Sequence, residues 1–215
     1  MTPQFVVFDL DGTLIDGYAA IADALSYAMR QLGREELPLE RVRGMVGHGL
    51  ERLIEKAVGP DLAPEGVRLF RERYPQVAVE KTELVPGVPE VLSELELRGH
   101  ILAVASNKPA RFSRLILDAK GVADRFLVIS GPDEQIPPKP DPAMLRATMG
   151  LARATPAETL VVGDMEIDAE MARSAGCRVV LVPGGSRTRV ELAAVGADAL
   201  LGDLRELPRW IETWT

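Results

Sequence analysis

Two carboxylates stand close together at the end of the first apolar segment of the chain. Phe5-Val6-Val7-Phe8 is short, β-branched and aromatic, which is typical of a buried strand, and Asp9-Leu10-Asp11-Gly12-Thr13 follows it directly. In an open parallel α/β sheet, ligands bind at the carboxyl ends of the strands. Unpaired carboxylates at such a position cost on the order of several kcal/mol. A divalent cation is therefore the simplest explanation for Asp9 and Asp11.

Two other interpretations of this segment are an ordinary turn and a calcium loop. Asp-Gly is a common turn dipeptide, and Asp-x-Asp-Gly also opens calcium-binding loops. The calcium loop is excluded because its twelfth position requires an acidic residue and Ala20 stands there. The simple turn becomes less attractive once the other strand ends are considered.

A second apolar segment, residues 101–105, ends at Ser106 and Asn107. A serine side chain together with backbone N–H groups at the start of a helix can bind a phosphate group. The alternative is helix capping, because Ser and Asn are good N-caps and the Pro109 that follows suits a first helical turn.

Two further segments carry charged residues that could belong to a site: a proline-rich loop with one lysine, and the end of another apolar segment with two acidic residues. Lys139 lies in the proline-rich segment 137–142, and a cation held in a stiff loop can neutralise negative charge without reorganising. Most lysines are simply solvated, so Lys139 alone decides little. The apolar segment 159–163 ends at Asp164, with Asp168 four residues later. Acidic residues are also favoured at a helix N-terminus, which is the alternative explanation for this pair.

The elements expected around these residues alternate between strand and helix. Strands are expected at residues 5–8, 101–105, 126–129, 159–163, 179–182 and 199–201. Helices are expected at residues 91–97 and 112–119. A further helix is expected from about residue 142, before the strand 159–163, and another after that strand, ending at Gly176. This alternation predicts an α/β protein with a doubly wound, mainly parallel, Rossmann-like sheet.

The segment from about residue 17 to 83 interrupts the alternation. Its apolar residues recur at spacings of three and four, with no strand between them. It is expected to be an all-helical cap domain, inserted after the first strand and joined to the core by two short connections. The predicted domains are an α/β core of residues 1–16 and 84–215 and a cap of residues 17–83.

Size and composition exclude several classes of protein. The chain has 215 residues, 47% of them hydrophobic, and a net charge of −7, which argues against nucleic acid as a partner. No apolar run is long enough to span a membrane, and no leader precedes the first strand. The single cysteine, Cys177, fits a reducing compartment. We therefore expect a cytoplasmic protein that does not bind membranes and is a monomer or a homodimer.

The four motifs together, in this order, resemble those of the haloacid dehalogenase (HAD) superfamily of hydrolases. The matches are the Asp9–Thr13 segment, Ser106, Lys139 in Lys-Pro-x-Pro, and Gly163-Asp164 with Asp168. The helical segment after the first motif resembles the C1-type cap of that superfamily. The resemblance covers essentially the whole chain and implies an enzyme, a Mg²⁺-dependent phosphatase.

The resemblance also implies a role for each matching residue. Asp9 would be the nucleophile that forms an aspartyl-phosphate, and Asp11 would be the general acid and then the general base. Mg²⁺ would be held by Asp9, by the backbone carbonyl of Asp11 and by Asp164, while Asp168 would orient a bound water or Lys139. The residues expected to bind the phosphate group are Thr13, Ser106, the amide of Asn107, and Lys139.

Charge supports the need for a metal ion. The carboxylates of Asp9, Asp11, Asp164 and Asp168 bring up to four negative charges, and a phosphate dianion adds two more. Lys139 supplies one positive charge and Mg²⁺ two, so without the metal the nucleophile and substrate would repel each other. Residual negative charge also favours a protonated Asp11.

Within the superfamily, the residues favour phosphatase chemistry. Members that cleave carbon–halogen bonds lack an acid at the position of Asp11, so Asp11 argues against a dehalogenase. Phosphonate-cleaving members use a cap lysine, and neither Lys56 nor Lys81 obviously matches it. The mutase branch carries a histidine shortly after the first motif, and the helix that begins at Tyr18 contains none.

The cap segment 44–53 and Ser106-Asn107-Lys108-Pro109 look like those of phosphoglycolate phosphatases. A glycine-rich turn would open a helix over the site, where His48 and Arg52 could contact a small carboxylate. An ordinary turn with both side chains solvated is the alternative. The chain departs from the common pattern at Gly17 and Met165, which puts the substrate in doubt more than the reaction.

The expected substrate is thus 2-phosphoglycolate. The related alternatives are another small phosphate ester, pyrophosphate, or a sugar phosphate isomerised by a mutase. The alternative from a different class is a non-catalytic binding module that keeps the fold, because fold alone does not establish function.

Overall fold

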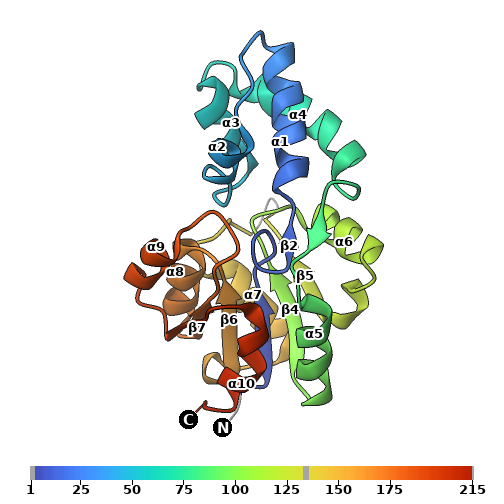
Figure 1. The fold of residues 1–215 in the computed structure, drawn as a ribbon. Helices are drawn as coiled ribbons and strands as arrows, with labels where there is room; N and C mark the ends of the chain where they lie inside the picture. Colours follow the sequence, from blue (N-terminus) through green and yellow to red (C-terminus); the bar gives the residue numbers. More distant parts are fainter. Residues whose placement is uncertain (1–2, 133–135, 215) are drawn as a thin grey trace.

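Six apolar segments form one parallel sheet in the computed structural model, which describes residues 3–132 and 136–214 (Figure 1). The strand order is β5-β4-β1-β6-β7-β8, and every neighbouring pair is parallel. The strands are β1 Phe5–Phe8, β4 Ile101–Ala105, β5 Val128–Ser130, β6 Thr159–Gly163, β7 Arg178–Leu181 and β8 Ala199–Leu200. The chain runs outward from β1 in one direction and then in the other, so the predicted doubly wound α/β fold is confirmed.

Helices cover both faces of this sheet. The side chains of Val6 and Phe8 belong to an apolar cluster with the first group of helices, and those of Phe5 and Val7 belong to a second cluster with the other group. The first group is α5 Val88–Leu97, α6 Ala110–Ala119 and α10 Leu207–Ile211, and the second is α7 Ala143–Ala152, α8 Glu166–Ala175 and α9 Arg189–Ala194. Because both faces of β1 are buried, its sequence is continuously apolar instead of alternating.

The register of the three central strands decides where their polar residues meet. Phe8 in β1 is level with Val104 in β4 and with Val162 in β6. The next residues in each strand are therefore also level, and Asp9 N–H continues the ladder by donating to Val162 O at 2.8 Å. The polar residues that follow these strands consequently emerge at one edge of the sheet, at the point where the strand order reverses.

Four helices lie between β1 and the rest of the sheet along the chain. They are α1 Tyr18–Gln31, α2 Leu39–Arg43, α3 Leu50–Val58 and α4 Ala63–Val77, and Figure 1 shows them grouped above the carboxyl ends of the strands. Two short antiparallel strands, β2 Ile15–Asp16 and β3 Glu83–Leu84, join this group to the core. The division into a core of residues 1–16 and 84–215 and a cap of residues 17–83 stays a prediction. Within the predicted core, residues 1–2, 133–135 and 215 lie outside the part of the chain that the structure describes.

The structure differs from the sequence expectations mainly at element ends. β5 was expected at 126–129 but pairs only from Val128, because Phe126 and Leu127 lead into it from the 3₁₀ turn Ala123–Arg125. The short elements β2, β3 and α10, and the 3₁₀ turns Pro156–Glu158 and Leu204–Glu206, were not expected, because so few residues carry no recognisable period. Among the described residues, no helix has the length and apolar character needed to cross a membrane.

Truncation of a core leucine tests this packing. Leu160 in β6 is fully buried between its neighbours, so Leu160→Ala should lower the free energy of unfolding by about 2–5 kcal/mol. The matched control is Leu151→Ala in α7, where the side chain is 66% exposed and the change should stay within about 0.5 kcal/mol. Urea titrations of both variants measure the difference; equal midpoints would contradict the assigned packing.

Candidate active site

Lys139 forms the centre of the polar cluster at the carboxyl edge of the sheet. Its side chain is 1% exposed, and its Nζ donates to Asp9 Oδ1 at 2.5 Å and to Asp168 Oδ1 at 2.7 Å. Burial alone would lower the pKa of Lys139, but the two carboxylates raise the pKa above its usual value. The ammonium group therefore stays charged and holds one oxygen of Asp9 in a fixed position.

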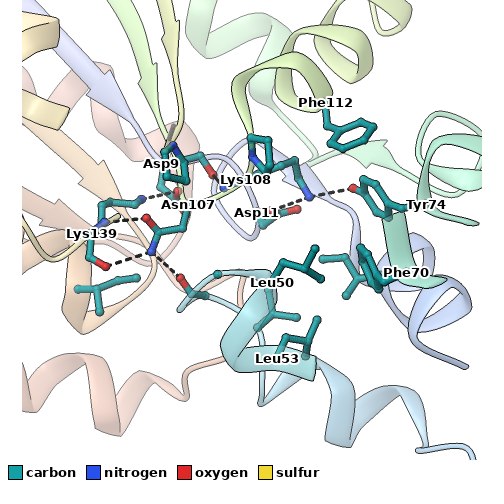
Figure 2. Close-up of a pocket in the computed structure, with 18 of the residues that line it drawn as sticks. Asp9, Asp11, Leu50, Leu53, Phe70, Tyr74, Asn107, Lys108, Phe112 and Lys139 are labelled. Atoms are coloured by element: carbon teal, nitrogen blue, oxygen red, sulfur yellow. Dashed lines mark hydrogen bonds and ion pairs between the residues drawn. The ribbon is translucent and has the colours of Figure 1, made fainter. Parts of the chain in front are cut away.

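Asn107 fixes the loop that carries Lys139 (Figure 2). Its Oδ1 accepts the Lys139 backbone N–H at 2.7 Å, and its Nδ2 donates to the Lys139 carbonyl at 3.1 Å. The same Nδ2 donates to the carbonyl of Gly47, between α2 and α3, at 2.9 Å. The Asn107 side chain thus joins the lysine loop to the helical segment. Because the Asn107 side chain is already hydrogen-bonded, the predicted contact with phosphate would be made by the Asn107 backbone N–H. That contact stays a prediction.

Asp168 is held at the start of α8, directly after β6. Its Oδ2 accepts the backbone N–H groups of Asp164 at 3.3 Å and Met165 at 3.1 Å, while its Oδ1 accepts from Lys139. A Cβ on Gly163 would lie 2.3 Å from Asp168 Oδ2, so only glycine leaves room for this carboxylate. Asp168 is thus in direct contact with Lys139, and its predicted role in orienting that lysine or a bound water stays a prediction.

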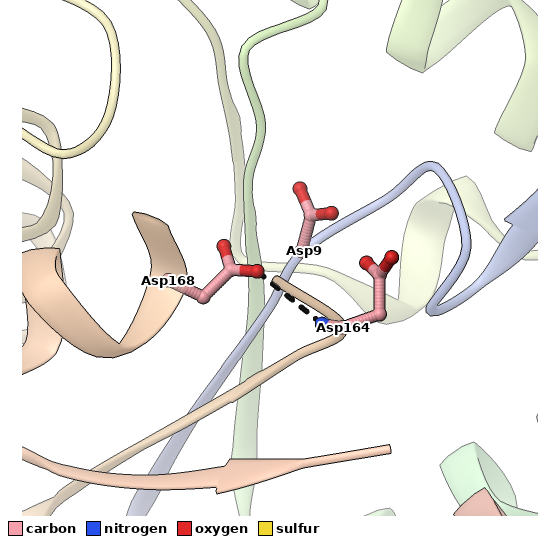
Figure 3. Close-up of side chains that lie close together, drawn as sticks. All are labelled: Asp9, Asp164 and Asp168. Atoms are coloured by element: carbon pink, nitrogen blue, oxygen red, sulfur yellow. Dashed lines mark hydrogen bonds between the residues drawn. The ribbon is translucent and has the colours of Figure 1, made fainter. Parts of the chain in front are cut away.

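Asp9, Asp164 and Asp168 form a buried acidic cluster (Figure 3). One carboxylate oxygen from each lies within 4.8 Å of the others. Asp164 Oδ1 accepts the hydroxyl of Thr13 at 3.1 Å, whereas Asp164 Oδ2 is buried with no hydrogen-bond partner. Burial, followed by repulsion from Asp9 and Asp168, raises the pKa of Asp164 well above its usual value. An orphaned carboxylate oxygen among other acids fits a divalent oxygen-binding cation.

Asp11 is paired with Lys108, a residue to which the sequence analysis gave no role. The Lys108 Nζ lies 2.9 Å from Asp11 Oδ2 and donates to the Tyr74 hydroxyl of α4 at 2.8 Å. The other oxygen of Asp11 is buried without a partner. Burial raises the pKa of Asp11, and Lys108 opposes that shift. The sequence offered one indication of a role for Lys108, which is that it directly follows the expected site residues Ser106 and Asn107. Its partner Tyr74 lies 34 residues away, so no local pattern could indicate that contact.

The two lysines change the charge of the site. Asp9, Asp11, Asp164 and Asp168 contribute −4 when ionised, and Lys108 and Lys139 contribute +2, which leaves a net charge of −2. One divalent cation would neutralise that charge. A substrate phosphate would then meet a site that no longer repels it.

Ser106 faces the pocket, whereas Thr13 is buried beside the acidic cluster. Ser106 lines the pocket that contains Asp9 and Asp11, where its Oγ accepts the Lys108 backbone N–H at 3.2 Å. Thr13 is fully buried and its hydroxyl is used by Asp164. Ser106 is thus beside the reacting carboxylates, while Thr13 orients the acidic cluster. Phosphate contact by either residue stays a prediction.

His48 and Arg52 lie in a neighbouring groove. They line it with Lys139, Glu166 and Ile167, and neither His48 nor Arg52 lines the pocket that contains Asp9 and Asp11. His48 Nε2 is 3.9 Å from Glu166 Oε1, and Arg187 binds both oxygens of Glu166 at 2.7 and 2.8 Å. Substrate contact by His48 and Arg52 stays a prediction, and Lys139 and Ile167 line both spaces.

Comparison with known proteins gives the same assignment as the motifs. The family model for haloacid dehalogenase-like hydrolases matches residues 6–182. The chain is 36% identical over 214 residues to a Pseudomonas putida protein named phosphoglycolate phosphatase, covering 95% of this chain and 78% of that protein. It is also 36% identical over 182 residues to the Aquifex aeolicus phosphoglycolate phosphatase, covering 85% of each.

Solved structures agree with the fold. A predicted phosphoglycolate phosphatase from Haemophilus somnus superimposes with a TM-score of 0.88 at 28% sequence identity, covering 96% of this chain and 97% of that one. A phosphate complex of CbbY from Rhodobacter sphaeroides superimposes with a TM-score of 0.82 at 25% identity, covering 96% of both chains.

Substitution of one glycine tests the cation site without removing a carboxylate. A Cβ on Gly185 would lie 1.5 Å from Asp164 Oδ2, so Gly185→Ala must displace that oxygen. We expect Mg²⁺ affinity, measured by calorimetry, to fall by about 10–100-fold. The control is Gly150→Ala within α7, where nothing lies within 4 Å of the added Cβ and affinity should not change. Equal affinities would show that Asp164 does not hold the ion.

The pH dependence of cation binding tests the electrostatics. Burial is the largest cause that raises the pKa of Asp168, to about 6, and the pKa of Asp164 is raised as well. These groups lose protons as the pH rises, and a cation competes with those protons. The Kd for Mg²⁺ should therefore fall between about pH 5 and about pH 7, by up to about tenfold per unit for each proton displaced. Titrations in buffers of different protonation enthalpy should show proton release; a Kd that rises with pH would contradict the assignment.

Proposed function

The chain belongs to the haloacid dehalogenase-like hydrolase family and is a phosphatase, and we propose that it hydrolyses a small phosphate monoester with Mg²⁺ and an aspartyl-phosphate intermediate. The first candidate substrate is 2-phosphoglycolate, because relatives about 36% identical carry that activity in their names. The observation that carries the proposal is the arrangement of Asp9, which Lys139 holds beside Asp164 and its orphaned oxygen.

Asp9 is the proposed nucleophile. One of its oxygens is held by Lys139, which leaves the other to attack phosphorus as the bond to the leaving oxygen breaks. The product of this step is an aspartyl-phosphate on Asp9 and a free alcohol. Lys139 stays charged and offsets the negative charge gathered around the transferred group.

Asp11 is the proposed proton donor and acceptor. It gives its proton to the leaving oxygen in the first step, and it takes a proton from the water that hydrolyses the aspartyl-phosphate in the second. Burial raises the pKa of Asp11 while Lys108 lowers it. Opposed influences of this kind suit a carboxyl group that must first give and then accept a proton.

The cation fits the residues described above. Asp9, Asp164 and the backbone carbonyl of Asp11 would hold Mg²⁺, which supplies positive charge next to the phosphate oxygens. Thr13 orients Asp164 for this purpose, and Asp168 orients Lys139. Ser106 and the Asn107 backbone amide are the proposed neutral donors to the phosphate group.

Phosphate release from 2-phosphoglycolate, with Mg²⁺ and with EDTA, tests the proposal beside a panel of small phosphate esters and pyrophosphate. Asp9→Asn and Asp11→Asn should each lower kcat by at least about a hundredfold, because each removes a group that reacts. Asp118→Asn is the control, since Asp118 lies on the exposed face of α6 and should leave turnover unchanged.

Three outcomes separate the possibilities. Metal-dependent release that favours phosphoglycolate supports both reaction and substrate. Another favoured ester keeps the reaction and replaces the substrate. Full turnover by a folded Asp9→Asn protein would rule out the aspartyl-phosphate.

A further inference from the structure

The pocket above Asp9 and Asp11 has a polar floor and an apolar wall (Figure 2). The floor consists of Asp9, Asp11, Ser106 and Lys139, which the proposed phosphoryl transfer uses. The wall on the other side comes mainly from the helical segment, with six apolar or aromatic side chains: Val46, Leu50, Leu53, Phe70, Tyr74 and Phe112.

Three aromatic rings make part of this wall rigid. Phe70 and Tyr74 stack with ring centroids 5.2 Å apart, and Tyr74 meets Phe112 edge to face, also at 5.2 Å. Phe112 belongs to α6 of the core, so the rings pack across from α4 to the core. The Tyr74 hydroxyl accepts from Lys108, which leaves the rings themselves as the apolar surface.

Three of the four cationic side chains that line the described pocket are held in ion pairs. Lys139 is bound to Asp9 and Asp168, and Lys108 is bound to Asp11. Arg71 pairs with Glu51 at 2.8 Å, and Arg111 is exposed and stacks on Phe112. Among the described lining residues, therefore, no buried cation without a partner is left to receive a carboxylate on the leaving group. A small leaving group that carries a charged carboxylate would lie against this apolar wall without a partner, which costs free energy.

The volume of the pocket is also larger than a two-carbon acid requires. It is about 460 Å³. That volume lies within the range of about 300–1,000 Å³ found for pockets that enclose drug-sized ligands. A bound phosphate group and its cation would take up the polar floor, which leaves the space beside the wall for the remainder of the substrate.

We propose that the apolar wall is a leaving-group subsite for alcohols that carry an alkyl chain or an aromatic ring. The inference rests on the proposed phosphatase function and widens its substrate class beyond 2-phosphoglycolate to phosphate monoesters with an apolar body. Burial of that body against Leu50, Leu53 and the aromatic rings provides the affinity, while Asp9 and Lys139 act on the phosphate end common to all such esters.

A series of n-alkyl phosphates tests the subsite directly. Ethyl, butyl and hexyl phosphate have leaving groups of nearly equal acidity, so differences in kcat/KM report contact with the wall and not chemistry. Each added methylene that enters the subsite should raise kcat/KM about three- to fourfold until the wall is covered. Phosphate release from 2-phosphoglycolate is measured in parallel as the reference for the reaction itself.

A pair of variants assigns the effect to the wall. Leu50→Asn places a polar group of similar size in the wall, and the rise in kcat/KM with chain length should become smaller. Leu115→Asn, on the solvent side of α6 where the side chain is 43% exposed, is the matched control and should keep the wild-type rise.

The outcomes distinguish this inference from the function on which it rests. A flat or falling alkyl series, with phosphate still released from ethyl phosphate or phosphoglycolate, would overturn the subsite and leave the phosphatase intact. An equal rise in the Leu50→Asn protein would also overturn the assignment to this wall. Release from none of the esters would overturn both proposals.

Discussion

The site depends on how four carboxylates can share one largely buried edge of a sheet. Asp9, Asp11, Asp164 and Asp168 are tolerated there because Lys139 binds two of them and Lys108 binds a third. Removing either lysine would leave largely buried carboxylates without their cationic partner, which is strongly destabilising. The net charge of −2 that remains is what a divalent cation, if bound, would neutralise.

The fold supplies this arrangement by simple means. Parallel strands in register bring residues from distant parts of the chain to one edge, and the reversal of strand order opens a crevice there. The helical segment then contacts the crevice at two consecutive core residues, Asn107 through the Gly47 carbonyl and Lys108 through Tyr74. The helical segment and Asp11 are therefore physically connected, because the same Lys108 ammonium group binds Asp11 and Tyr74 of α4.

Prediction from the sequence succeeded where a pattern is local or repeated. The apolar strands, the amphipathic helices and the motif order indicated the α/β class and the family, and both are confirmed. It was less complete where a residue's role depends on a distant partner. The Thr13 hydroxyl donates to Asp164, and His48 and Arg52 lie in a neighbouring groove beside Glu166, which no local pattern indicated; the predicted phosphate and substrate contacts of these residues stay predictions.

By itself, the sequence determined which chemical groups follow each strand and in what order, because secondary structure and strand-end position follow from short-range patterns of apolar and polar residues. Only the tertiary structure decided the pairings: Lys108 with Asp11 and Tyr74, Asn107 with both backbone groups of Lys139, and an apolar wall facing a charged floor. The reason is that pairings depend on register, helix rotation and side-chain direction, which are set by packing between segments far apart in the chain.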